Sequence, residues 1–210
     1  YFLSQFLALP AFAFDDGDLQ IWSTQAVEKK LNDNLKVKVE NESRFGDNVR
    51  VIYYDHIDGG ITFKTNENLD LGVNYRQVWG KKKGKWKKEN RPHLNGTLKW
   101  KWSDFKFKNR NRFEWRRLEG KEDGWRYRNK LSLYFPWKWE EFDVQPYVAD
   151  EVFLDFAGGG INRNRVYAGV GFKPFKYLKA DLYYIWQTLE GSRNKWTDWN
   201  VIGIKLKAVF

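Results

Sequence analysis

Apolar and polar residues alternate along most of the chain from Leu19 onward. The segment 69–76 reads LDLGVNYR, for example, and the segment 105–108 reads FKFK. Because successive side chains of a β-strand point to opposite faces, this period of two predicts strands with one apolar and one polar face. No segment carries the i, i+3, i+4, i+7 spacing of an amphipathic helix for more than two turns. The pattern therefore predicts an all-β fold.

The alternation divides the chain into eleven runs, most of them longer than the ~5–6 residues usual for strands of soluble sheets. A tilted strand that crosses a membrane needs ~9–11 residues. Tight turns, as at 102–105, and longer polar segments, as at 80–90 and 119–124, separate the runs, which is typical of membrane barrels. The runs are 18–29, 34–46, 49–65, 69–80, 91–103, 105–118, 125–135, 143–156, 163–173, 178–188 and 198–210.

The number of runs conflicts with the even strand count of single-chain bacterial barrels. Either run 49–65 contains two strands broken at Asp58-Gly59-Gly60, a possible hairpin turn, or a run near the N-terminus is missed. We therefore expect about 12 strands, with 10 as the next choice.

Alternation alone does not identify the face that meets water. In a soluble sandwich the charged faces lie outside, whereas in an outer-membrane barrel the apolar face meets lipid and the charged face lines the lumen. Aromatic residues gather at the ends of the runs, as in interfacial girdles. The last run ends on Phe210, and a C-terminal strand that ends in an aromatic residue resembles the assembly signal of outer-membrane barrels. We expect a single antiparallel up-and-down transmembrane β-barrel, with a secreted sandwich or lipocalin-like barrel as the alternative.

The N-terminal segment 1–13 reads YFLSQFLALPAFA, an apolar run that ends in a small-x-small pattern. It resembles the end of a secretory signal peptide, with cleavage after Ala13, although an apolar strand or helix is the alternative. We therefore expect a signal-peptide remnant at 1–13, a barrel domain at 14–210, and export to the outer membrane of a Gram-negative bacterium.

Composition excludes several classes of protein. The chain has 210 residues, no Cys, 19% aromatic and 30% charged residues, and a formal net charge of +10. The absence of Cys excludes disulfides and thiolate metal sites. The aromatic content argues against disorder, and no apolar stretch approaches the ~20 residues of a membrane helix.

Six segments resemble a bacterial outer-membrane family catalogued as domain of unknown function 2490. They are DLQIWST (18–24), VENESRFGDN (39–48), LGVNYRQ (71–77), RNRFEWR (110–116), YRNKLSLYF (127–135) and VQPYVADEVF (144–153). The resemblance implies a membrane barrel of unassigned role over nearly all of the mature chain. It implies no catalytic residues.

With the apolar face outward, the inward positions are rich in basic residues. One interpretation is a lumen filled and rigidified by cross-strand ion pairs, and the other is a pore or pocket whose anion-preferring wall is formed by the strands around 99–130. The candidate lumen charge network consists of Glu40, Glu42, Arg44, Arg76, Arg110, Arg112, Glu114, Arg116, Arg126, Arg128, Lys130 and Glu151.

We expect an outer-membrane barrel of unassigned role, either a narrow channel with a charged lumen or a structural barrel. We expect no cofactor, no metal and no enzyme activity. An outer-membrane acyl hydrolase or transferase, or a soluble binding protein, is the alternative. An enzyme would pair His56 with Ser43 or Ser132, and no motif marks either serine.

The expected partners are the lipid bilayer and the barrel-assembly machinery. The Lys-rich segment 81–88 could meet lipopolysaccharide phosphates or remain a solvated loop. Nucleic acid, which basic residues interleaved with Trp86 could bind, is not expected for an exported chain.

Overall fold

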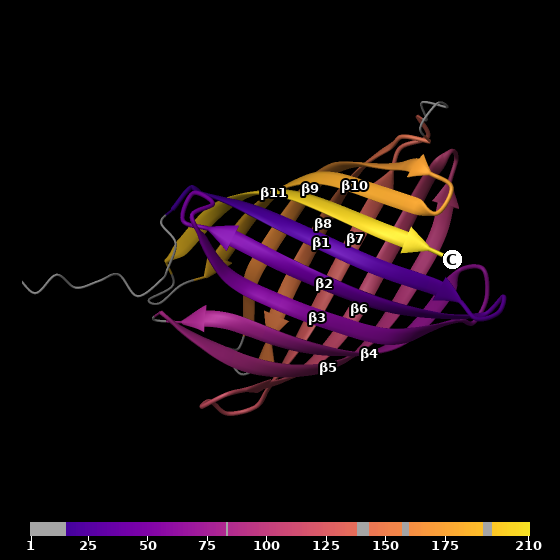
Figure 1. The fold of residues 1–210 in the computed structure, drawn as a ribbon. Helices are drawn as coiled ribbons and strands as arrows, with labels where there is room; N and C mark the ends of the chain where they lie inside the picture. Colours follow the sequence, from indigo (N-terminus) through magenta and orange to yellow (C-terminus); the bar gives the residue numbers. More distant parts are fainter. Residues whose placement is uncertain (1–15, 83, 138–142, 157–159, 191–194) are drawn as a thin grey trace, which may run out of the picture.

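Within the residues that the computed structural model describes, which are 16–82, 84–137, 143–156, 160–190 and 195–210, eleven strands form one closed barrel (Figure 1). The predicted all-β, up-and-down barrel is confirmed. The predicted signal remnant at 1–13 lies outside the described residues. The strands are β1 (Asp18–Lys30), β2 (Leu35–Gly46), β3 (Val51–Lys64), β4 (Leu69–Lys82), β5 (Lys85–Trp102), β6 (Phe105–Leu118), β7 (Gly124–Tyr134), β8 (Gln145–Asp155), β9 (Gly160–Phe175), β10 (Leu178–Glu190) and β11 (Trp196–Val209).

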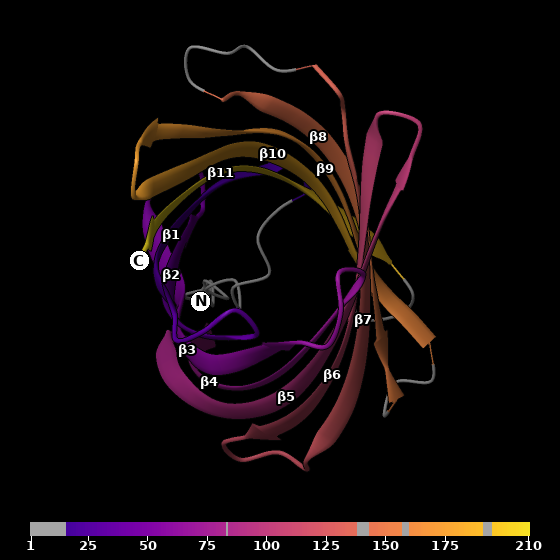
Figure 2. The same ribbon diagram turned by 90° about the vertical axis from the view of Figure 1, so that its right-hand side faces the viewer.

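Eleven described strands close the ring, one fewer than the expected twelve. β3 continues through Asp58-Gly59-Gly60, so this segment makes no hairpin. When consecutive strands alternate in direction, the first and last members of an odd set run the same way. β1 and β11 accordingly pair in parallel, from Asp18 opposite Trp199 to Glu28 opposite Val209, and this β1–β11 seam completes the ring seen end-on in Figure 2.

The chain's last residue takes part in the β1–β11 seam. The backbone N–H of Phe210 donates to the carbonyl of Glu28 (2.9 Å), and the Phe210 carbonyl accepts from the N–H of Lys30 (2.9 Å). The same end of the barrel carries the connections 31–34, 65–68, 103–104 and 176–177, and we call it the C-terminal end.

One segment expected to be a loop is largely strand. β4 extends to Lys82 and β5 begins at Lys85, so most of the polar segment 80–90 forms the end of the β4–β5 hairpin. None of the described residues forms a helix long and apolar enough to cross a membrane.

Large apolar side chains cover much of the outer face. Val73, Leu94 and Val39 expose 65%, 60% and 57% of their surface, although each lies within a strand. Aromatic pairs stack near both ends: Trp100 with Phe107 near the C-terminal end, and Trp115 with Trp125 near the opposite end. The barrel is therefore apolar outside, with aromatic residues toward its ends.

Outward polar groups interrupt this apolar face at several places, and two of these groups illustrate how their members are hydrogen-bonded to one another. On β6 and β7, the Asn129 amide donates to Asn109 (3.0 Å) and to Asn111 (2.9 Å). On β2 and β3, Ser43 and Asn41 both donate to the Asp55 carboxylate, at 2.5 and 3.0 Å. These bonds reduce the free-energy cost of placing polar atoms on an apolar surface.

The inner face is divided between an apolar wall and a charged one. The inner side of β1 and β8–β11 carries a buried apolar cluster that includes Trp22, Tyr147, Tyr167 and Ile185, whereas charged side chains dominate inside β2–β7. Glycines make room for the rings. A Cβ at Gly203, for example, would lie 2.0 Å from the ring of Tyr183, its partner on β10.

Candidate functional site

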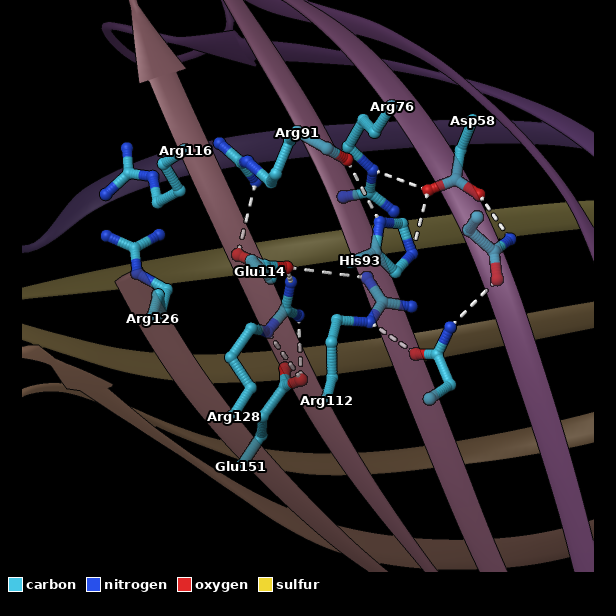
Figure 3. Close-up of polar contacts among 12 residues, drawn as sticks. Asp58, Arg76, Arg91, His93, Arg112, Glu114, Arg116, Arg126, Arg128 and Glu151 are labelled. Atoms are coloured by element: carbon cyan, nitrogen blue, oxygen red, sulfur yellow. Dashed lines mark hydrogen bonds and ion pairs between the residues drawn. The ribbon is translucent and has the colours of Figure 1, made fainter. Parts of the chain in front are cut away.

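The first cluster of buried charges lies between β3, β4 and β5. Asp58, only 1% exposed, accepts a hydrogen bond from Nε of Arg76 at 2.8 Å and another from the amide of Asn74 at 3.0 Å. His93 on β5 places its Nε2 3.5 Å from the same carboxylate (Figure 3). One carboxylate thus joins three neighbouring strands.

Glu114 is the centre of the second cluster. It is completely buried and faces three guanidinium groups: Arg128 at 2.9 Å, Arg112 at 3.6 Å and Arg91 at 3.7 Å (Figure 3). These partners come from β5, β6 and β7. A carboxylate in this position needs such partners, because an unpaired charge away from water is costly.

Glu151 on β8 forms a third centre. Its Oε1 lies 2.7 Å from Arg110 and 2.7 Å from Arg128, and its Oε2 accepts a hydrogen bond from the Tyr167 hydroxyl at 2.8 Å. Arg165 on β9 lies 3.6 Å away. Because Arg128 also contacts Glu114, the second and third clusters form one network running from β5 to β9.

Further ion pairs lie beyond these clusters, both toward one end of the barrel and around the wall on β2. Toward the end opposite the C-terminal end, Arg116 pairs with Glu89 (2.6 Å) and Arg126 pairs with Asp155 (2.5 Å). On the β2 side, Arg44 pairs with Glu42 at 2.6 Å. Glu40 accepts from Lys38 at 3.0 Å and also bonds Lys205 across the β1–β11 seam.

Stacked side chains extend into the lumen in the half of the barrel away from the C-terminal end. The guanidinium carbon of Arg44 lies 3.6 Å from the centroid of the Trp22 ring, and that of Arg165 lies 4.6 Å from the same ring. Arg165 also lies 4.7 Å from the centroid of Phe153, which in turn contacts Arg128 at 4.5 Å. This chain of cation–π contacts links β2, β1, β9, β8 and β7, and its contact between Arg165 and Trp22 joins strands that are not neighbours in the sheet.

A cavity of about 750 Å³ lies between these stacked side chains and the C-terminal end. Arg76, Arg112 and Arg128 lie at its base, and lysines such as Lys106 and Lys179 lie near its mouth. Its described lining contains fifteen basic and seven acidic residues. The cavity is therefore a basic pocket.

All twelve residues of the candidate lumen charge network lie on the inner face. The structure brings most of them together around Glu114, Glu151, Glu40 and Glu42, and places Arg116 and Arg126 in the neighbouring Glu89–Asp155 group. Lys130 lies apart from these ion pairs, with its Nζ 3.3 Å from the centroid of the Tyr167 ring. The placement shows a network that both fills the lumen and lines the pocket.

Sequence reasoning missed Glu89 and Arg91, which are both buried and paired. Both lie an even number of positions from the inward-facing His93. Arg91 is the first residue of the run 91–103, and extending that run backward by two residues would have included Glu89. Interpreting 80–90 as a loop excluded Glu89. The inward orientation of the Trp22 and Phe153 rings could not be predicted, because alternation assigns inward positions to polar residues.

The serine–histidine pairs of an enzyme are not assembled. Ser43 bonds Asp55 on the outer face, whereas His56 lies inside with Nε2 3.8 Å from Glu40. Ser132 lines the cavity, but neither histidine is among the described lining residues. Within the part of the chain that the structure covers, no three His, Asp or Glu side chains are grouped to hold a metal ion.

The fold and its interior define a closed β-barrel with an apolar outer face and a lumen rich in buried ion pairs. The chain belongs to the family described as "Protein of unknown function (DUF2490)", whose model matches residues 19–198. This agrees with the resemblance seen in the sequence. No curated protein and no solved structure gives a significant match.

Proposed function

We propose that the chain is an outer-membrane barrel of a Gram-negative bacterium whose lumen is closed, so that it serves as a structural barrel rather than an open channel. One observation carries this proposal: apolar side chains face outward and charged side chains face inward, the reverse of the arrangement in a soluble protein. Aliphatic side chains such as Val73 and Leu94 are exposed outside, while Asp58, Glu114 and Glu151 are 0–1% exposed inside.

The outer face suits lipid better than water. Soluble monomers rarely expose large contiguous apolar patches, whereas transmembrane strands carry apolar residues outward between aromatic girdles. The strands have 11 to 18 residues, which exceeds the ~9–11 needed to cross a membrane. The Lys-rich β4–β5 hairpin, at the end opposite the C-terminal end, would then face lipopolysaccharide phosphates. Phe210 would serve as the signal read by the assembly machinery.

A lysine placed outside or inside the same wall tests the membrane proposal. Val73→Lys should lower the stability of the inserted barrel by about 2–4 kcal/mol, because a lysine facing mid-bilayer lipid carries that cost. Thr62→Lys adds the same charge on the neighbouring strand, but its side chain faces the cavity. We expect it to have a much smaller effect.

The measurement is urea unfolding in lipid vesicles, together with outer-membrane fractionation and heat-dependent gel mobility. If Val73→Lys folds, fractionates and unfolds as the unsubstituted protein does, the outer face meets water and the soluble alternative holds.

The closed lumen makes a separate prediction. In planar bilayers the purified protein should show no steady ionic conductance, because the Arg44–Trp22–Arg165 stack crosses the lumen where polar residues are also fully buried. A stable, anion-selective current from the folded protein would contradict the closed lumen and favour the channel. It would leave the membrane assignment unchanged.

A further inference from the structure

Basic residues face one another directly across neighbouring strands on the inner wall of β5, β6 and β7. Four consecutive inward positions of β6 each oppose another basic residue. The opposed pairs are Lys101–Lys106, Lys99–Lys108, Arg110–Lys130 and Arg112–Arg128. Like charges directly opposite one another destabilise a sheet, so this arrangement works against the stability of the barrel alone.

The carboxylates of the lumen neutralise only part of the positive charge on this wall. Asp70 pairs with Lys99 at 2.7 Å, and Glu114 and Glu151 form ion pairs with arginines. No ion pair with a described carboxylate reaches Lys106 or Lys108, and both side chains are exposed within the barrel. The uncompensated charge therefore lies toward the mouth of the cavity.

At the base of the cavity, Arg112 is held by few acceptors of its own. Its Nε donates to Asn95 at 2.7 Å, and its nearest carboxylate contact is the 3.6 Å approach to Glu114. Arg112 lines the cavity, although only 6% of its surface is exposed. A guanidinium at the base and ammonium groups at the mouth thus surround one enclosed space.

We propose that this cavity binds a multivalent oxyanion, a small molecule that carries two or more phosphate or carboxylate groups. Arg and Lys form strong charge-assisted hydrogen bonds with both kinds of group, and about 750 Å³ is within the usual size of a ligand pocket. The bound anion would supply the charge that the wall lacks. The inference rests on the closed lumen of the proposed function and not on membrane insertion.

The test uses the full chain folded in detergent micelles, with inorganic tripolyphosphate and citrate as probes in separate titrations followed by calorimetry. Sodium chloride at matched ionic strength is the control for screening. Lys106→Gln/Lys108→Gln removes two cavity charges. Lys121→Gln/Lys195→Gln removes two exposed charges at the end opposite the C-terminal end and serves as the matched control.

We expect saturable binding that the cavity variant weakens by about tenfold to 100-fold, since it removes two charge-assisted contacts, and that the control variant leaves unchanged. Tighter binding of tripolyphosphate than of citrate would identify phosphate ligands, and the reverse order would identify carboxylates. Without ligand, the cavity variant should melt at a higher temperature than the unsubstituted protein, because two like-charge oppositions are relieved.

A purely structural role for these lysines would give the opposite result, a lower melting temperature for the cavity variant and no change in affinity. That result, or the absence of saturable binding to either probe, would overturn the inference. Neither would bear on the membrane assignment, which the Val73→Lys comparison tests.

Discussion

Replacing Glu151 with alanine is expected to lower the free energy of unfolding by about 3–5 kcal/mol, the usual effect of removing one partner from a buried ion pair. Glu151 is 1% exposed and serves Arg110, Arg128 and Arg165 as well as the Tyr167 hydroxyl. Without it, three guanidinium groups keep their charge, and two of them, Arg128 and Arg165, are only 9% and 4% exposed. The loss of stability measures the free-energy cost of leaving those buried charges unpaired, rather than the net strength of the ion pairs.

Asp70→Ala is the matched control. Asp70 also pairs with a basic residue, Lys99, at 2.7 Å, but the two side chains are 16% and 33% exposed. We expect a change of only about 0–1 kcal/mol there, as for other water-accessible pairs. Urea unfolding of the folded protein, followed by tryptophan fluorescence and gel mobility, measures both. Equal losses in the two variants would show that water from the cavity reaches Glu151 as freely as it reaches Asp70.

The barrel could be predicted from the sequence because alternation is a local property. A charged residue every second position, as at Lys106, Lys108, Arg110 and Arg112, fixes both the strand and the face. The eleven runs correspond one to one with the eleven described strands. The expectation of twelve came from the even count of other bacterial barrels, whereas the parallel β1–β11 pairing closes an odd ring without an extra strand.

The pairing within the lumen could not be predicted in the same way. Alternation places Glu114 and Arg128 on the inner face but does not fix the register that sets them 2.9 Å apart. Contacts across the lumen, such as Arg165 over Trp22, join strands that are not neighbours in the sheet. They depend on the barrel's closure and curvature, and no local pattern in the sequence encodes them.

Closure itself can be tested with a cross-link, since the chain has no cysteine of its own. Ser23 on β1 and Ile204 on β11 are directly paired across the β1–β11 seam, and directly paired positions on adjacent strands lie within the ~4.4–6.8 Å Cα separation of a disulfide. Ser23→Cys/Ile204→Cys should therefore form one under mild oxidation. Because the link closes a loop of most of the chain, it should raise the free energy of unfolding by about 5 kcal/mol.

Ser23→Cys/Leu206→Cys is the control for register. Leu206 faces the same way as Ile204 but pairs with Gln25, and two residues along a strand add ~6.6 Å, which places the cysteines beyond reach of each other. Faster migration on non-reducing gels and resistance to heat should appear only in the Ser23/Ile204 variant. If the control variant cross-links as readily, the seam has another register. If neither does, β1 and β11 are not neighbours, and the described strands do not close the ring by themselves.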